Sequence, residues 1–228
     1  MRKLVRFGMG WSFLLAMALS VVTSAWAEVG TDPELRILVR VYNYARIPSP
    51  ILLQAERDAG WIFRKAGVTI DWLECPLSNA QMQTPEACQR ELSSTGIVLR
   101  ILFCAKKAKL RLPKGVFGFA VPAQGAGHAF LASVYYDRLH DVASTHDVYA
   151  AEILGPAIAH EIGHLLLPSR KHARAGVLTG EWRKEQVWLA TRRGLVFTRE
   201  ECEFIRADVA ARMREQGTTP DPPALPTE

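Results

Sequence analysis

The chain has 228 residues, of which 49% are apolar and 22% are charged, a balance that supports a packed core and excludes a disordered protein. Its 16 glycines and 13 prolines form no repeat, which excludes a collagen-like chain. Basic residues exceed acidic ones by five, but Arg2, Lys3 and Arg6 stand in the first 27 residues, and the rest of the chain holds 25 basic against 23 acidic residues. A charge so close to balance argues against a nucleic-acid partner.

The first 27 residues have the pattern of a secretory signal peptide. A short basic start precedes an uncharged run from Phe7 to Trp26, and Ala25 and Ala27 are the small residues of a signal-peptidase site. We therefore expect cleavage before Glu28 and a secreted or periplasmic protein. The alternative is an uncleaved membrane anchor, because the run is close to the roughly 20 residues that a span needs. No later run approaches that length, so we expect the mature chain to have no membrane span.

The first half of the mature chain predicts three strands and a helix. Residues rich in β-branched and aromatic side chains predict strands over 35–44, 68–73 and 96–103. A helix with proline in its first turn is predicted over 49–67, between the first two strands. This strand–helix–strand order predicts a crossover that joins two parallel strands.

The next segments predict two more strands and a long helix. Residues 115–123 form a short strand that glycine interrupts and proline ends, and these features are typical of an edge strand. Residues 128–136 predict another strand. A helical region begins near 146 or 147 and reaches 167. We expect Pro156 either to kink it or to start a new helix with Gly155 as its cap.

The end of the chain predicts a last helix and a tail. Thr198 and Glu201 have the spacing of a capping box, which predicts the start of an amphipathic helix that reaches about residue 215. Residues 217–228 hold four prolines and few apolar residues, so we expect them to be disordered. The chain therefore divides into a signal peptide over 1–27, one domain over 28–216 and a tail.

Four cysteines would follow the exported chain into an oxidising compartment, where disulfides form. Cys75 and Cys88 bracket a polar loop of 12 residues, and we favour a bridge between them. Cys104 then pairs with Cys202 or stays buried and reduced. The chain contains no Cys-x-x-Cys pair, so a cysteine metal site is not favoured.

The segment His160-Glu161-Ile162-Gly163-His164 lies in the predicted long helix and carries the clearest chemical signal. His160 and His164 are four residues apart, which places both imidazoles on one helix face, where they can supply neutral nitrogens to one zinc ion. Glu161 points about 100° away from His160, a suitable place for a general base beside a metal-bound water. The alternative is a surface helix with two unrelated histidines.

A catalytic zinc needs a third protein ligand and one open position. Pro168 ends the helix, and His172 follows eight residues after His164, across a polar turn that can bring the chain back under the metal. His172 is therefore our third ligand. A solvated loop histidine is the alternative for His172, and Glu181 and Glu185 are the competing ligands.

The segment 160–164, the following His172 and Gly176-Val177-Leu178 together resemble the zincin superfamily of metallopeptidases, and within it the metzincin-like branch. The stretch 160–182 is also similar to a group of secreted bacterial zincin-like proteins. Two departures stand out, since the third histidine comes two residues later than in the usual branch and Leu178 replaces a methionine. The resemblance implies an α+β fold, in which a twisted mixed sheet places an edge strand over a cleft, one helix carries the HExxH motif and a helix ends the domain.

The resemblance also implies an exported zinc-dependent peptidase. Zn²⁺ bound by His160, His164 and His172 would activate a water, and Glu161 would act as general base. A peptide or protein substrate would pair with the edge strand, for which the candidates are Gly115, Val116, Phe117, Gly118 and Phe119. Two alternatives remain: a non-catalytic zincin-like metal-binding or interaction domain, and an exported domain without metal. The other histidines are interpreted as ordinary surface or core residues: His128, His140 and His146.

Overall fold

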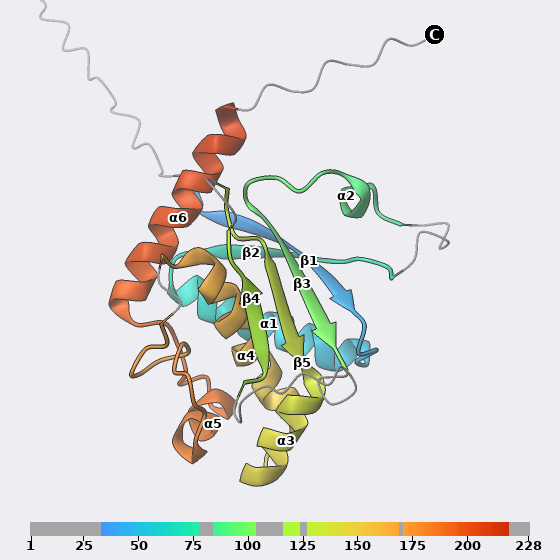
Figure 1. Cartoon of the computed structure of the whole chain (residues 1–228), viewed down its shortest axis with the longest axis vertical. Helices are drawn as coiled ribbons and strands as arrows, with labels where there is room; N and C mark the ends of the chain where they lie inside the picture. Colours follow the sequence, from blue (N-terminus) through green and yellow to red (C-terminus); the bar gives the residue numbers. More distant parts are fainter. Residues whose placement is uncertain (1–32, 78–83, 104–115, 124–126, 169–170, 219–228) are drawn as a thin grey trace, which may run out of the picture. The chain divides into compact units, whose positions relative to one another are not determined.

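In the part of the chain that the structure describes, five strands form one mixed sheet in the order β2-β1-β3-β5-β4 (Figure 1). The strands are β1 (Arg36–Asn43), β2 (Thr69–Glu74), β3 (Gly96–Leu102), β4 (Gly118–Val121) and β5 (Leu131–Tyr135). Four of them run parallel, and only β4 is antiparallel to its neighbour. With the helices described below, the architecture is the predicted α+β class.

This computed structural model describes residues 33–77, 84–103, 116–123, 127–168 and 171–218. From Glu34 onward, the described residues belong to one compact unit. Several predictions lie outside the described residues, namely the signal peptide, Cys104, Gly115 and the tail from residue 219. Among the helices that are described, none is both long and apolar enough to cross a membrane.

The crossover from β1 to β2 is confirmed. Helix α1 (Ser49–Lys65) begins with Pro50 in its first turn and connects the two parallel strands, in which Ile37 lies opposite Ile70. The side chains of Ile37, Val39 and Val41 alternate along β1 and are all buried. This alternation directs one face of the sheet into the core.

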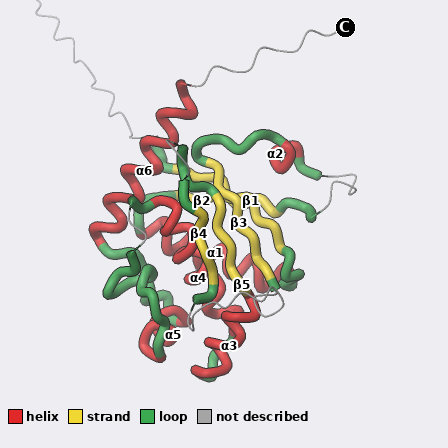
Figure 2. The backbone as a smooth tube through the Cα atoms, in the orientation of Figure 1, coloured by secondary structure: helices red, strands yellow, loops and turns green. Residues whose placement is uncertain are grey.

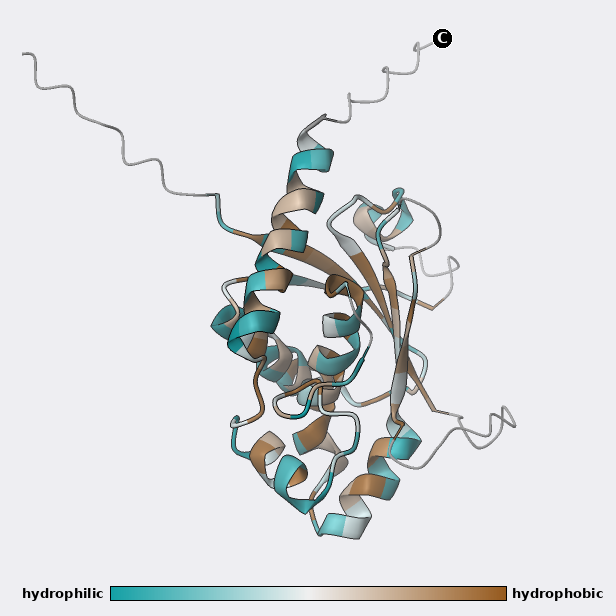
Figure 3. Cartoon of the chain, turned by 60° about the vertical axis from the view of Figure 1, so that its left-hand side comes forward, coloured by the Kyte–Doolittle hydropathy of each residue, from teal (hydrophilic) through white to brown (hydrophobic). Residues whose placement is uncertain are grey.

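Helix α4 (Ala150–Leu166) packs beside α1 and against β4 and β5 (Figure 1). The two helices approach closely at Gly155, where an added methyl group would stand 2.7 Å from both the carbonyl oxygen of Ala55 and Cβ of Asp58. Figure 3 shows most strand residues as hydrophobic, whereas the helices alternate between hydrophobic and hydrophilic turns. The core therefore lies between the sheet and the α1–α4 layer.

The edge-strand prediction is confirmed, although the strand is shorter than expected. Strand β4 pairs with β5 alone, with Gly118 opposite Val134 and Val121 opposite Leu131, and its other side has no strand partner among the described residues. It ends before Pro122, whose nitrogen cannot donate to a ladder.

The predictions for residues 128–167 are confirmed in part. The strand expected over 128–136 ends at Tyr135, and helix α3 (Tyr136–His146) follows it directly and buries Leu139 and Ala143. The expected long helix is α4, which starts at Ala150, a few residues later than predicted, and contains Pro156 in its interior, so the alternative of a new helix capped by Gly155 is wrong. Almost every residue of α4 is buried, and the stabilisation from this burial exceeds the cost of the one backbone hydrogen bond that proline removes.

The C-terminal helix α6 (Arg199–Thr218) is confirmed, together with its capping box, but it includes residues 217 and 218, which were expected to belong to the disordered tail. Thr198 Oγ1 accepts from the backbone N–H of Glu201 at 3.3 Å, and the Glu201 carboxylate accepts from the N–H of Thr198 at 2.7 Å. Two further helices were not predicted: α2 (Glu86–Gln89) and α5 (Lys184–Thr191), both visible in Figure 2.

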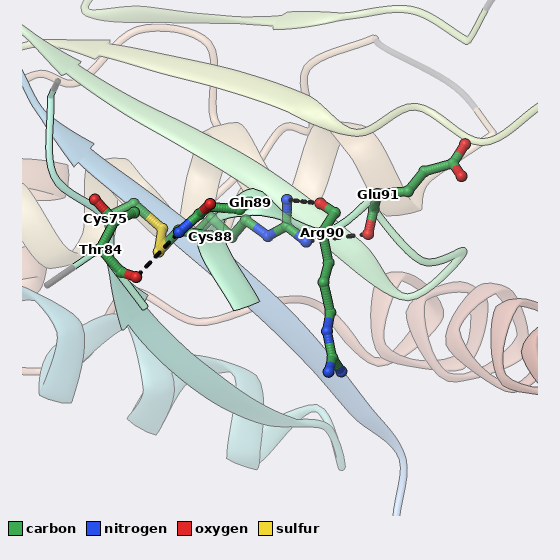
Figure 4. Close-up of a disulfide and its surroundings, with 7 residues drawn as sticks. Cys75, Thr84, Cys88, Gln89, Arg90 and Glu91 are labelled. Carbon is green, nitrogen blue, oxygen red and sulfur yellow. Dashed lines mark hydrogen bonds between the residues drawn. A yellow bond between two sulfur atoms is a disulfide. The ribbon is translucent and has the colours of Figure 1, made fainter. Parts of the chain in front are cut away.

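The predicted Cys75–Cys88 disulfide is present and closes a segment with a sequence separation of 13 (Figure 4). Cys202 has a free thiol, so it does not form the bridge that was one of its two alternatives. The residues after Cys88 cover part of the sheet, because the carbonyl oxygens of Arg90 and Glu91 accept hydrogen bonds of 2.9 and 3.1 Å from Arg40 of β1.

Candidate metal centre

Two imidazoles lie side by side on α4. His160 and His164 are one helical turn apart, and their Nε2 atoms are 3.1 Å from each other. The i, i+4 spacing places them on one face, as the sequence predicts. Their rings meet edge to face, with centroids 4.7 Å apart.

Surrounding groups fix the orientation and protonation of His160, whose side chain is only 3% exposed. Its Nδ1 lies 2.7 Å from the carbonyl oxygen of Val177, and because a carbonyl can only accept, Nδ1 carries the proton. Burial, followed by the neighbouring His164, lowers the pKa of His160 to about 3. The ring is therefore neutral, and Nε2 presents a lone pair to His164.

Aromatic rings pack around His160 on its other sides. The Phe117 ring stands edge-on to the imidazole with centroids 5.6 Å apart, and Trp182 contacts Phe117 in the same manner at 4.7 Å. Phe117 and Trp182 are both buried. These rings restrict the imidazole to one orientation and shield it from water.

His172 approaches the pair from the loop after α4. Its ring centroid is 5.3 Å from that of His160 and 5.1 Å from that of His164, although the residue itself is exposed. The chain after it turns back on itself, because Ala173 forms a bridge with Thr179 and its N–H donates to Leu178 at 2.9 Å. This turn brings the third histidine to the other two.

The three histidines fit a zinc ion. Each offers one ring nitrogen, and these three atoms all lie within 4.8 Å of one another. Tetrahedral zinc with Zn–N bonds of about 2.0–2.1 Å separates its nitrogen ligands by roughly 3.3 Å, so the 3.1 Å pair already has the required spacing. Neutral nitrogen ligands oriented by a backbone carbonyl are the donor set that zinc prefers.

Glu161 lies beside the cluster and beneath the edge strand. It is 3% exposed, and burial raises the pKa of its carboxyl group to about 8. A methyl group added to Gly118 of β4 would stand 2.5 Å from Cδ and Oε1 of Glu161, so the carboxyl group occupies space that any other residue at position 118 would fill. A cation held by the histidines would favour the ionised carboxylate and lower this pKa.

One cavity of about 180 Å³ brings the predicted groups together. Its lining combines the three histidines and Glu161 with Gly180 and the edge-strand segment Val116–Ala120. The predicted substrate-binding candidates Val116, Phe117, Gly118 and Phe119 therefore face the same space as the histidine cluster. Strand β4 therefore forms part of the wall of this cavity.

The competing ligands lie elsewhere. Glu181 is exposed and forms an ion pair of 2.9 Å with Arg183, and Glu185 is exposed in the first turn of α5. Neither carboxylate belongs to the group of ligand atoms that converges around His160. Within the described residues, His172 is thus the third member of the cluster.

The remaining histidines have ordinary surroundings, as expected. His128 Nε2 contacts a carboxylate oxygen of Glu215 at 2.9 Å, and the His140 ring packs edge-on against Tyr136 at 5.0 Å. His146 ends α3. None of these three side chains lines the cavity of the cluster.

Sequence reasoning missed the groups that orient the cluster. The carbonyl of Val177 gives no sequence signal, because every residue has one. Gly118 was predicted as a substrate-binding candidate but not as a contact of Glu161, and Gly180 was not singled out from the sequence. Leu178, at the position of the expected methionine, is buried and would lie 3.2 Å from a methyl group added to Gly163, the residue before His164.

The chain has little similarity to known proteins. No protein-family model and no curated protein matches it. Among solved structures, the archaemetzincin of Methanopyrus kandleri is 17% identical, with a TM-score of 0.43 over 77% of this chain and 96% of that chain. A zinc-dependent peptidase from Methanocorpusculum labreanum is 14% identical, with a TM-score of 0.45 over 75% of this chain and 99% of that chain. Likenesses this distant assign no activity to the chain.

Proposed function

We propose that the protein is an exported zinc-dependent peptidase of the zincin type. The observation that carries the proposal is the convergence of His160, His164 and His172 in a cavity whose lining also includes a buried glutamate and residues of the edge strand. A zinc ion held by the three imidazoles would supply Lewis-acid chemistry, because it lowers the pKa of bound water to about 7 and polarises a carbonyl group.

Glu161 is the proposed general base. Its carboxylate accepts a proton from the attacking water at one carboxylate oxygen and then gives it to the nitrogen of the leaving amine. A cation held by the neighbouring histidines would favour the ionised carboxylate, which is the form that a base needs. Gly118 supports this role as well, because the missing side chain lets the carboxyl group lie directly against the edge strand.

Strand β4 is the proposed binding site for the peptide backbone. An edge strand offers a row of unpaired N–H and C=O groups, and an extended peptide satisfies them by adding one more strand. Residues of β4 line the cavity that contains Glu161 and the histidines, so a peptide added to this strand would lie close to the reacting groups. This arrangement favours a peptide over a small-molecule substrate.

The substitution Glu161→Gln tests the proposed base. We expect the variant to bind zinc like the wild type and to cleave a library of fluorogenic peptides about 10²–10⁴-fold more slowly, because only proton transfer is lost. Glu185→Gln is the matched control, since this glutamate is exposed and remote from the cluster, and it should change neither property. Undiminished cleavage by Glu161→Gln would refute the mechanism, whereas a zinc-loaded wild type without any cleavage would support the non-catalytic alternative.

Export is part of the proposal and is supported by the first 27 residues and by the Cys75–Cys88 bridge, which is stable in oxidising compartments. Sequencing the N-terminus of the exported protein tests it directly. Cleavage as proposed gives Glu28 as the first residue, and retention of Met1 in a membrane fraction would favour the uncleaved anchor.

A further inference from the structure

Gly180 lies in direct contact with the third histidine. A methyl group added to Gly180 would stand 2.7 Å from Cγ and Nδ1 of His172 and 2.9 Å from its Cβ. Distances below 3.0 Å are not tolerated by packed carbon atoms, and the three nearest atoms all belong to His172. The His172 ring therefore occupies space that is open only because residue 180 has no side chain.

His172 depends on such a contact more than its partners do. His160 and His164 project from one helix, and His160 is also fixed by Val177 and by surrounding rings. His172 instead is exposed and belongs to a loop, so ordering its side chain costs conformational entropy.

The turn between the two residues holds Gly180 in place. Ala173, directly after His172, forms a bridge with Thr179, directly before Gly180. Thr179 is fixed in turn, because its N–H and Oγ1 both donate to the carbonyl oxygen of Gly176, at 3.2 and 2.8 Å. The backbone at Gly180 is thus a firm surface on one side of the imidazole.

We propose that Gly180 is a positioning residue for the third metal ligand. Its bare backbone sets the orientation of the His172 ring and so allows a ligand at the unusual spacing of eight residues after His164 to reach the cluster. The proposal rests on the zinc site of the proposed function. It concerns the side chain only, because the φ angle of Gly180 is not positive and its backbone accepts alanine.

The test is a double-mutant cycle read out as zinc affinity, measured by competition with a chelator. We expect Gly180→Ala to weaken zinc binding about 10–100-fold, the range typical of groups that orient metal ligands. Gly194→Ala is the matched control, because its methyl group would meet the flexible Leu189 side chain at 2.8 Å, away from the cluster, and we expect unchanged affinity. In a His172→Ala background, Gly180→Ala has no clashing ring to displace and should have no further effect.

Two results would overturn the proposal: wild-type affinity in Gly180→Ala, or the same loss of affinity with and without His172. If Gly180→Ala does not fold, the double variant with His172→Ala decides the question. Removal of the His172 ring should restore a folded protein. A double variant that still does not fold would show that the added methyl group clashes with another group. A wild-type protein that binds no zinc would instead overturn the proposed function, and this proposal with it. The two failures are therefore distinguishable.

Discussion

Glu56 is a buried carboxylic acid in the core-facing side of α1, away from the proposed chemistry. It is 5% exposed, and one of its carboxyl oxygens has no hydrogen-bond partner among the described residues. Burial, followed by repulsion from Glu74, raises its pKa from 4.5 to about 7. The fold thus holds this proton more tightly than the unfolded chain does, so stability decreases as pH rises from about 4.5 to about 7.

The substitution Glu56→Gln should remove this pH dependence. Above pH 7 we expect the variant to be more stable than the wild type by at most about 3 kcal/mol, because each pKa unit corresponds to about 1.4 kcal/mol. Below pH 4.5 the two proteins should be nearly equal. Urea denaturation between pH 4 and pH 8 measures the difference, and exposed Glu91→Gln is the control. If the free energy of unfolding of Glu56→Gln and of the wild type depended on pH in the same way, the raised pKa of Glu56 would be contradicted.

At the same residue scale, the sequence predicted the side chains of the histidine cluster and Glu161 but not the groups that surround them. His160, His164 and Glu161 follow from helical spacing, and His172 follows from the turn after Pro168. The contact of His160 with Val177 uses a backbone carbonyl, and the contact of His172 with Gly180 depends on a missing side chain. Neither kind of contact leaves a pattern in the residue types.

At the scale of elements, hydrogen bonds from one arginine of α6 connect this helix to the C-terminal end of α4. Arg212 is 1% exposed, and its guanidinium donates to the carbonyl oxygens of Leu165 at 3.0 Å and Ala129 at 3.1 Å and to Asp208 at 2.6 Å. Leu165 lies in the last turn of α4, whose carbonyl groups lack helical partners. The cation therefore stabilises the helix end next to His164.

We expect Arg212→Met to lower the free energy of unfolding by about 2–4 kcal/mol, because the change leaves buried carbonyl groups without a donor. Arg214→Met, an exposed change on the same helix, should alter it by less than about 0.5 kcal/mol. Urea denaturation of both variants checks the difference. An equal change in the free energy of unfolding for both variants would mean that the buried hydrogen bonds of Arg212 do not stabilise the fold.

The elements that the sequence predicted are those with strong local signals. The first three strands follow from β-branched runs, and α6 follows from its capping box at Thr198. The α3 helix was missed because it begins at Tyr136, directly after a strand, with no separating turn residues. The residue types left two alternatives open at Pro156, because tertiary burial decides whether a helix continues past a proline.

At the scale of the whole sheet, the disulfide and the histidine cluster occupy opposite edges. Cys75 directly follows β2, which is the first strand of the sheet, and the cavity borders β4, which is the last. Strands β2 and β4 are four strand spacings of about 4.8 Å apart, so roughly 19 Å separates the two edges. The bridge therefore stabilises the fold without contacting the site.

The double substitution Cys75→Ser with Cys88→Ser should reduce the free energy of unfolding by about 3 kcal/mol, because the unfolded chain regains the entropy of a short loop. Zinc affinity of the folded variant should stay within about twofold of the wild type. Denaturant titration and chelator competition give the two values. A large loss of zinc affinity in a fully folded variant would contradict this independence, because it would show that the disulfide affects the histidine cluster.

The central claim is that three histidines from a helix and a following loop bind one zinc ion. The most direct test is the zinc content of purified wild-type protein and of His172→Ala after dialysis against a weak chelator, measured by elemental analysis. We predict one zinc per wild-type chain and a loss of at least about 100-fold in affinity for the variant, since removing a ligand costs more than removing a group that orients one. A wild type without zinc, or a variant that retains it as tightly, would contradict the claim.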